Sequence, residues 1–255
     1  MPLELVTIPC LADNYAYLIH NADTGQTAVI DVPDAAPISA ALKERGWMLS
    51  DVLLTHHHWD HVDGLADLLA DHPANVIGAE ADAHRLPTLN ATVADGDRLA
   101  ICGEEMQVLD VSGHTLGHVA FYFAASNMVF TADSLMALGC GRLFEGTPDQ
   151  MFDSLSKLAA LPPQTLVCSG HEYTQSNAKF AITIDPENAA LISRVQQVEQ
   201  ARAAGEATVP SLLSLELSTN PFLRCTDPAV QATVGMIGAD PAAVFAEIRT
   251  RKDNF

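Results

Sequence analysis

The sequence lacks paired cysteines. Its five cysteines are scattered along 255 residues and form no C-x-x-C pair. An odd, dispersed set argues against a disulfide framework and against a thiolate metal site. A reducing compartment is therefore expected, and we expect the protein to be cytoplasmic.

Basic residues and long apolar runs are also scarce. Thirteen lysines and arginines stand against 32 aspartates and glutamates, which gives a formal net charge of -19 and a pI near 4.6. Such a charge repels phosphate backbones and anionic lipid surfaces, so neither a nucleic acid nor a membrane is an expected partner. No run of about 18 uncharged apolar residues suggests a membrane span, and no basic segment precedes an apolar run at the N-terminus. Nothing in the sequence requires a dimer, so a monomer is expected.

The chain changes character near residue 173. Before it, strand-like runs alternate with helical stretches; strands are expected at 3–8, 15–19, 27–31, 52–55, 75–78, 98–101, 106–111, 119–123, 128–132 and 165–168, and helices at 38–45, 65–70 and 149–161. After it come helical segments at 177–184 and 186–204, with shorter ones after Pro210, Pro228 and Pro241. The sequence therefore predicts an α/β (α+β) domain at 1–173 and a helical appendage at 174–255.

A dense group of possible metal ligands follows the expected strand at 52–55. His56, His58, Asp60 and His61 fall within six positions of the segment THHHWDHVDG. In extended backbone, side chains two positions apart point the same way, so His56 and His58 can hold one ion, and a turn beyond them brings Asp60 and His61 to a second. A solvated polar loop is the alternative, but the group is internal, interrupted by other residues and placed at a strand end. Between these ligands, Trp59 is expected to pack rather than to contact substrate.

Three further candidates, His114, Asp133 and His171, each follow a strand-like run. Alone, a histidine after glycine is more often a loop residue, and an aspartate after a strand is more often a helix cap. Together with the first group they make seven nitrogen and oxygen donors without a thiolate. Structural zinc sites are typically closed, four-coordinate and rich in cysteine, so this set favours a catalytic centre over a non-catalytic metal-binding module.

The pattern H-x-H-x-D-H with a separated His, Asp and His resembles the metallo-β-lactamase superfamily, and within it the glyoxalase II family of hydroxyacylglutathione hydrolases. The matching segments are 55–61, 113–118, 139–146, 170–173, 220–222 and 249–253, which extend over nearly the whole chain. The resemblance implies a four-layer αββα sandwich of two mixed sheets with a C-terminal helical region. In that scheme 1–173 is the catalytic domain and 174–255 binds glutathione.

The resemblance also implies the role of each ligand. It assigns His56, His58 and His114 to one metal ion and Asp60, His61 and His171 to the other, with Asp133 bridging both. A hydroxide held between the ions would attack a thioester carbonyl, with Asp60 and Asp133 as the catalytic carboxylates. Two divalent ions per chain are expected; zinc is the default, and iron or manganese would also suit these donors.

Further residues are assigned by the same resemblance. It places glutathione, which carries two carboxylates, against Arg142, Tyr173, Arg249 and Lys252. Without the resemblance, Arg249, Arg251 and Lys252 would be taken as cations at a solvated helix end, where they complement the helix dipole. Asp31 would support the ligand loop, with an ordinary turn residue as the alternative, while His57 and His118 are expected to be structural hydrogen-bonding groups.

The expected activity is hydrolysis of S-2-hydroxyacylglutathione thioesters, such as S-lactoylglutathione to glutathione and lactate, the second step of methylglyoxal detoxification. The alternative is a mononuclear iron glutathione persulfide dioxygenase of the same superfamily, which uses two histidines and one aspartate. A superfamily nuclease would need a basic surface, which the net charge denies. Three positions depart from the family pattern. Phe144 stands where tyrosine is usual, and Ala132 and Asp63 stand where glycine is usual. They bear on substrate affinity and loop geometry, and none is a ligand.

Overall fold

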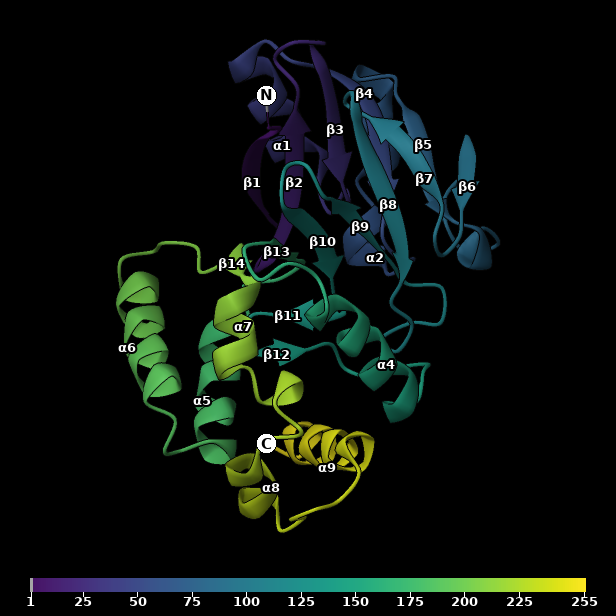
Figure 1. Ribbon diagram of the computed structural model, residues 1–255. Helices are drawn as coiled ribbons and strands as arrows, with labels where there is room; N and C mark the ends of the chain where they lie inside the picture. The colour runs from purple at the N-terminus through teal and green to yellow at the C-terminus, as the bar shows by residue number, and fades with distance from the viewer. Residues whose placement is uncertain (1) are drawn as a thin grey trace. The chain divides into compact units, whose positions relative to one another are not determined.

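The computed structural model describes residues 2–255 (Figure 1). By its internal contacts the chain forms two compact units. We call the first unit the chain up to Asp110 together with Leu116–Thr131, and the second unit Val111–Thr115 together with Ala132–Phe255. Within the described residues no helix has both the length and the apolar character needed to cross a membrane.

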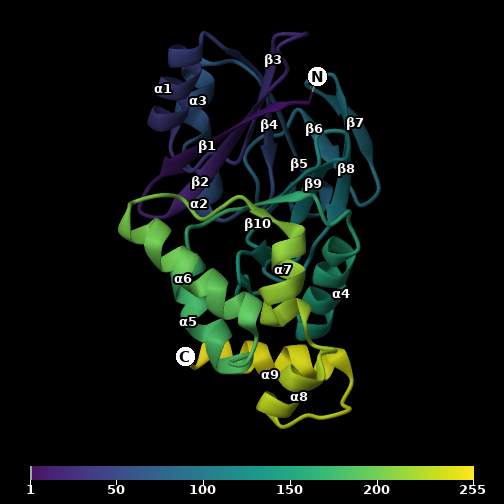
Figure 2. The same ribbon diagram turned by 60° about the vertical axis from the view of Figure 1, so that its left-hand side comes forward.

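The first unit contains a six-stranded mixed sheet in the order β1-β2-β3-β4-β5-β6. Strands β1 (Glu4–Cys10), β2 (Asn14–His20) and β3 (Gln26–Ile30) are antiparallel, whereas β4 (Met48–Leu54), β5 (Asn75–Ala79) and β6 (Ala91–Val93) continue from β3 in parallel. Parallel neighbours need crossover connections, which here include the helices α1 (Ala35–Arg45) and α3 (Leu65–Asp71). These two helices lie side by side (Figure 2), and their apolar residues join those of the sheet in one buried cluster.

The first unit also contains four antiparallel strands. These are β7 (Arg98–Ile101), β8 (Glu104–Asp110), β9 (Val119–Phe123) and β10 (Met128–Ala132), whose last residue belongs to the second unit. Three aromatic side chains of these strands are fully buried, Phe121, Phe123 and Phe130. Tyr17 of β2 meets Phe130 edge to face, with ring centroids 5.6 Å apart, so the two sets of strands share a core.

The second unit is mainly helical. It contains α4 (Pro148–Ala159), α5 (Thr174–Ile184), α6 (Ala189–Ala203), α7 (Leu213–Thr219), α8 (Pro228–Val234) and α9 (Pro241–Asp253), with a short 3-10 helix at Pro221–Leu223. Two short strand pairs accompany them, β11 (Leu135–Met136) with β12 (Gly139–Cys140), and β13 (Leu166–Ser169) with β14 (Ser211–Leu212). Helices α5 and α6 pack side by side, as do α4 and α9 (Figures 1 and 2).

Local sequence explains where these helices begin. Side chains of Thr147, Asn188, Asp227 and Asp240 each accept a hydrogen bond from the first turn of the helix that follows. Proline occupies an early position in α4, α8 and α9, where its missing N–H costs no helical hydrogen bond. The predicted domain boundary at residue 173 rests on the change from strand-like to helical sequence, whereas the two units are defined by contacts between residues. Because the two criteria differ, the domain boundary stays a prediction.

Candidate metal centre

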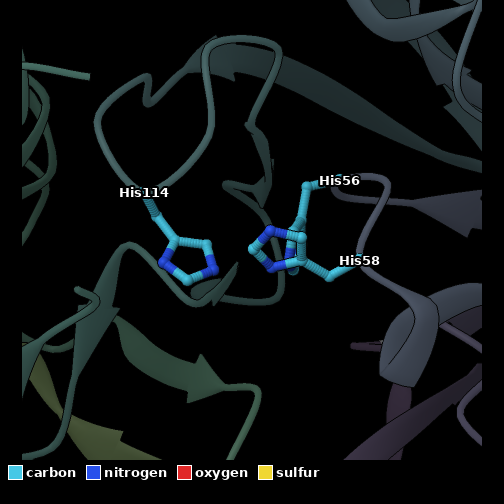
Figure 3. Close-up of side chains that lie close together, drawn as sticks. All are labelled: His56, His58 and His114. Carbon is cyan, nitrogen blue, oxygen red and sulfur yellow. The ribbon is translucent and has the colours of Figure 1, made fainter. Parts of the chain in front are cut away.

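The ligand segment of the first unit runs from the end of β4 into the one-turn helix α2 (Trp59–Val62). His56 and His61 are fully buried. The ring of His56 lies with its centroid 4.7 Å from that of His58 and 4.2 Å from that of His61. Figure 3 shows His56 and His58 extending from this segment, and it also draws His114, which belongs to the second unit. The carboxylate of Asp60 lies 3.9 Å from Nε2 of His61, so the structure brings all four predicted ligands of this segment together.

Asp31 orients two of these imidazoles. Its carboxylate accepts hydrogen bonds from the backbone N–H of Thr55 at 2.9 Å and the hydroxyl of Thr55 at 2.8 Å. Nδ1 of His61 lies 2.8 Å from the same carboxylate. Because the Thr55 hydroxyl donates to Asp31, its oxygen accepts from Nδ1 of His56, 3.0 Å away. In both neutral rings the proton sits on Nδ1, so Nε2 carries the lone pair that a metal needs. The sequence-based interpretation of Asp31 as a supporting residue is confirmed.

The position of Asp31 depends on an uncommon backbone conformation. Its φ is 57°, in the left-handed region, which aspartate enters more readily than most residues. Backbone hydrogen bonds hold this turn against the ligand segment, since Val32 N–H donates to the carbonyl of His61 at 2.8 Å and Gly64 N–H to that of Val32 at 3.0 Å. A Cβ on Gly64 would lie 2.8 Å from the backbone nitrogen of Ala35, so glycine permits this close approach.

Asn14 supports Asp60, a role that the sequence did not predict. The side-chain amide of Asn14 donates to the carboxylate of Asp60 at 3.1 Å and to its backbone carbonyl at 3.0 Å. Asn14 is 4% exposed. No spacing rule connects an amide at residue 14 with a ligand at residue 60. The only available signal is a buried polar residue at the start of a strand, and burial cannot be read from one residue's type.

His57, Trp59 and His118 lie beside the predicted ligands in sequence or in space. Nδ1 of His57 lies 2.9 Å from the buried carboxylate of Asp82, which Arg85 also contacts. His118 is buried and stacks on His56 with centroids 4.6 Å apart. His57 and His118 are therefore structural groups, as predicted. The expectation that Trp59 packs is wrong, because its side chain is 65% exposed at the first position of α2.

The second unit brings together the other three predicted ligands. The carboxylate of Asp133 lies 3.5 Å from Nε2 of His114 and 3.3 Å from Nε2 of His171. All three side chains are buried. Nδ1 of His114 donates to the backbone carbonyl of Arg142 at 2.7 Å, which leaves the Nε2 lone pair on the side of Asp133. His171 is covered by the ring of Tyr173, stacked with centroids 4.6 Å apart.

Two glycines permit close packing around this set. A Cβ on Gly141 would lie 1.8 Å from the carbonyl oxygen of Asp133 and 3.1 Å from Nδ1 of His114. A Cβ on Gly113, whose φ is 149°, would lie 2.8 Å from Cβ of Met151 in α4. Both positions therefore exclude any side chain, since real Cβ atoms do not approach so closely.

The four predicted glutathione contacts also belong to the second unit. Arg142 is exposed, and its Nε lies 3.6 Å from the carboxylate of Asp253, to which Arg249 donates at 2.8 Å. Arg249 is only 6% exposed and also donates to the carbonyl of Cys140 at 3.1 Å. Lys252 lies over the rings of Phe180 and Phe255. Burial and the nearby Arg249 lower the pKa of Lys252 from its ordinary value.

The three departures from the family pattern differ in their consequences. Asp63 has φ of -65° and ψ of -28°, a conformation open to any residue, so it does not disturb the loop. Ala132 has φ of 40°, where glycine would be less strained. Phe144 is 62% exposed and contacts His114 edge to face, so its ring lies beside the predicted ligands without a hydroxyl.

These donors fit divalent metal ions. Imidazole nitrogens and carboxylates suit zinc, iron and manganese, and the three histidines with assigned hydrogen bonds at Nδ1 each present Nε2. In the first unit, the carboxylate of Asp60 lies 3.9 Å from Nε2 of His61. The five cysteines are buried and free of disulfides, and burial raises the pKa of Cys10 to about 11 and that of Cys102 to about 12. Thiols with such pKa values are poor ligands near neutral pH.

Comparison with known proteins agrees with this donor set. Residues 12–171 match the model of the metallo-β-lactamase superfamily, and residues 172–255 match that of the hydroxyacylglutathione hydrolase C-terminus. A hydroxyacylglutathione hydrolase of Ruegeria pomeroyi is 68% identical over the full length of both chains. The chain belongs to the hydroxyacylglutathione hydrolase family. A second member, from Jannaschia sp., is 63% identical over 99% of this chain and 98% of its own.

Solved structures agree with the fold. The B3 metallo-β-lactamase BLEG-1 has a TM-score of 0.67 at 20% identity, over 86% of this chain and 99% of its own. The protein TTHA1623, solved in a di-iron-bound form, has a TM-score of 0.63 at 27% identity, over 86% of this chain and 100% of its own. The predicted metallo-β-lactamase fold with two mixed sheets is therefore confirmed. Membership of this family, together with the His/Asp groups, makes divalent metal ions the cofactor.

Proposed function

We propose that this hydroxyacylglutathione hydrolase family member hydrolyses S-2-hydroxyacylglutathione thioesters, with S-lactoylglutathione as the natural example. The observation that carries the proposal is full-length identity of 52–68% to proteins of that name. Both the ligand-bearing part and the C-terminal part of the chain match the corresponding family models. The persulfide dioxygenase alternative is not favoured, because these relatives carry the hydrolase name.

We further propose that the two His/Asp sets act together on two metal ions. His56, His58 and His114 would hold one ion, Asp60, His61 and His171 the other, and Asp133 both. The proton positions fixed by Asp31, Thr55 and the Arg142 carbonyl support Nε2 as the ligand atom of three histidines. Zinc is proposed, with iron and manganese as the competing candidates.

The chemistry needs few other groups. Divalent ions, when bound, lower the pKa of water from about 15.7 to about 7 and so supply hydroxide at neutral pH. Asp60, held by Asn14, and Asp133, between two histidines, would orient this nucleophile with their carboxylates. The departing group is a thiolate of pKa about 8.5, which leaves without help from a strong general acid. No serine or cysteine nucleophile is therefore required.

Substrate binding is proposed for the second unit. Arg142, Tyr173 and Lys252 would contact the glutathione part of the substrate. The buried Arg249 would add positive charge next to these contacts. The C-terminal helical segment, 174–255, is therefore proposed as the substrate-binding domain and 1–173 as the catalytic domain. The proposed setting is the cytoplasm, because buried thiols without disulfides suit a reducing compartment, and the proposed form is a monomer without nucleic-acid or membrane partners.

The direct test is loss of thioester absorbance from S-lactoylglutathione under anaerobic conditions, with metal content measured on the same protein. We expect hydrolysis by the wild type with close to two metals per chain. His58→Ala should lose at least 100-fold in kcat/KM, because a proposed ligand is removed. His84→Ala is the matched control, since His84 is exposed outside both ligand sets, and it should retain wild-type kinetics.

The same protein distinguishes the alternative. If metal-loaded wild type leaves the thioester intact but consumes oxygen with glutathione persulfide, the hydrolase proposal is wrong and the dioxygenase replaces it. If both His58→Ala and His84→Ala keep full activity, the proposed ligand set is wrong even where the activity is right.

A further inference from the structure

The hairpin formed by β11 and β12 connects the proposed ligand Asp133 to the proposed substrate contact Arg142. Every residue from Ser134 to Gly141 is buried. Leu138, at its turn, has φ of 56°, a left-handed conformation that leucine rarely adopts. A buried hairpin of this length needs partners for its backbone N–H and carbonyl groups, and a strained turn needs contacts that hold it.

Side chains from the C-terminal helices supply such partners. The amide of Asn220 donates to the carbonyls of Met136 at 3.1 Å and Gly139 at 2.9 Å. The carboxylate of Glu216 accepts from the backbone N–H of Leu138 at 2.9 Å. On the other side, Asn177 of α5 donates to the carbonyl of Ala137 at 3.1 Å. Asn220 and Glu216 are both 0% exposed, so water does not compete for these bonds.

Glu216 is itself held in place by charged and polar neighbours. Arg194 of α6 pairs with its Oε1, and Arg194 also donates to the hydroxyl of Thr219 at 2.7 Å. The hydroxyl of Ser211 donates to Oε1 at 2.6 Å, and the amide of Asn220 reaches Oε2 at 3.2 Å. A buried carboxylate with this many partners has one position, so the groups it contacts are fixed with it.

The hairpin in turn fixes the ligands of the second unit. Gly141 N–H donates to the carbonyl of Ser134 at 3.0 Å, which closes the hairpin directly after Asp133. The backbone of Gly141 packs so closely on Asp133 that no Cβ would fit between them. One residue further, the Arg142 carbonyl accepts from Nδ1 of His114 at 2.7 Å. Displacement of the hairpin would therefore shift both Asp133 and the acceptor that orients His114.

We propose that Asn220 and Glu216 are positioning residues for the metal centre, acting through the β11–β12 hairpin on Asp133 and His114. The helical segment then has a second task besides substrate binding, because it holds part of the ligand set in place. The kinetic part of the test rests on the proposed thioesterase activity, whereas the metal-binding part does not.

The test compares Asn220→Ala with wild type in two measurements. Zinc affinity is measured by competition with a chromogenic chelator, using zinc alone as the probe. We expect it to weaken by about 10-fold or more, the lower end of what loss of an outer partner of a ligand costs. With S-lactoylglutathione, kcat should fall by a similar factor, because the bound metal ions supply the nucleophile of the proposed reaction.

The matched control is Asn188→Ala. Asn188 also belongs to the helical segment and makes several hydrogen bonds, capping α6 and donating to the carbonyl of Ser218 at 2.9 Å. None of its hydrogen bonds reaches the hairpin. The control should lower the melting temperature but leave zinc affinity unchanged, which separates positioning from general stability.

The outcomes distinguish the two proposals. If Asn220→Ala folds and binds zinc as tightly as wild type and Asn188→Ala, the positioning role is wrong. If wild type does not cleave the thioester but Asn220→Ala still loses zinc affinity, the proposed activity fails and the positioning role stands. Should Asn220→Ala not fold, Asn177→Ala removes a single bond to the same hairpin, and wild-type zinc affinity in that variant would overturn the role.

Discussion

The buried carboxylate of Asp31 accepts three hydrogen bonds. One comes from the predicted ligand His61, and another comes from the Thr55 hydroxyl, which itself contacts the predicted ligand His56. Asp31→Asn keeps the size of the side chain but replaces one acceptor oxygen with an amide donor. That amide would face either Nδ1 of His61 or a donor of Thr55. We expect metal affinity to fall by about 10- to 100-fold, as it does when partners of metal-binding histidines are removed.

The measurement for Asp31→Asn is zinc competition, as above, with Asp34→Asn as its control. Asp34 caps α1 through a hydrogen bond to Ala36 N–H at 3.0 Å, and asparagine caps a helix about as well as aspartate. The control should therefore bind zinc normally. Equal zinc affinity in the two variants would contradict the supporting role of Asp31.

The lowered pKa of Lys252 predicts that KM depends on pH. Burial, and then the nearby Arg249, lower its pKa, while Cys140 and Asp253 act in the opposite direction. A lysine is charged below its pKa, so a lowered pKa means that the charge is lost at a lower pH than the usual value near 10.4. If Lys252 binds a glutathione carboxylate, KM should rise by roughly two- to fivefold as the pH increases through that pKa.

The check on Lys252 is the pH profile of KM for wild type and Lys252→Arg. Arginine stays charged throughout this range, so the variant should show a flatter profile. A profile that rises equally in both proteins would assign the titration to another group.

At the scale of elements, α4 shows how a helix supports a ligand without carrying one. Its residue Ser154 donates to the carbonyl of Ser112 at 2.7 Å, and Met151 packs on Gly113, directly before His114. The helix begins with a capping box in which Thr147 and Gln150 bond reciprocally. Thr147→Ala should cost about 1 kcal/mol of unfolding free energy, or roughly 2–4 °C in Tm.

Thermal unfolding of Thr147→Ala should be measured beside Thr250→Ala. Thr250 is exposed within α9, where alanine has the higher helix propensity, so the control should not be destabilised. Kinetic constants of Thr147→Ala should remain near wild type at temperatures well below Tm. An unchanged Tm would mean that the capping box contributes little to this helix.

Elements with a strong local signal were predictable. The strand-like run at 15–19 predicts β2, and the helix expected at 149–161 matches α4 to within two residues at each end. The segment at 186–204 begins later than predicted, at Ala189, because Asn188 is the cap. Strands β11 and β12 were not predicted, since two-residue strands have no period to detect.

In the candidate site, too, some residues could be predicted from the sequence and others could not. The seven predicted ligands were recognisable because metal donors have a restricted chemistry and a characteristic spacing, and the structure groups them as two local sets, one in each unit. Asn14, Glu216 and Asn220 were not recognisable, because each acts through a contact with residues more than 40 positions away. Such contacts follow from tertiary packing, which a single sequence does not display.

At the scale of the whole molecule, a net charge of -19 surrounds a site proposed to bind an anionic substrate and cationic metals. The acidic surface attracts divalent ions and repels glutathione thioesters at long range. Local cations must therefore offset the field at short range, which is the task proposed for Arg142, Arg249 and Lys252. Added salt screens the long-range repulsion but also weakens exposed contacts, so the two effects on KM oppose each other.

Metal binding should also stabilise the whole chain. An ion that binds only the folded state adds about 2.7 kcal/mol when its concentration is 100 times its Kd. Removal of the metals with a chelator should therefore lower Tm by roughly 5–10 °C, a shift that re-added zinc reverses. In His58→Ala the shift should be smaller, because one proposed ligand is already absent. A wild-type Tm that is indifferent to chelator, in protein shown to have lost its metal, would mean that the ligands are held without the ions.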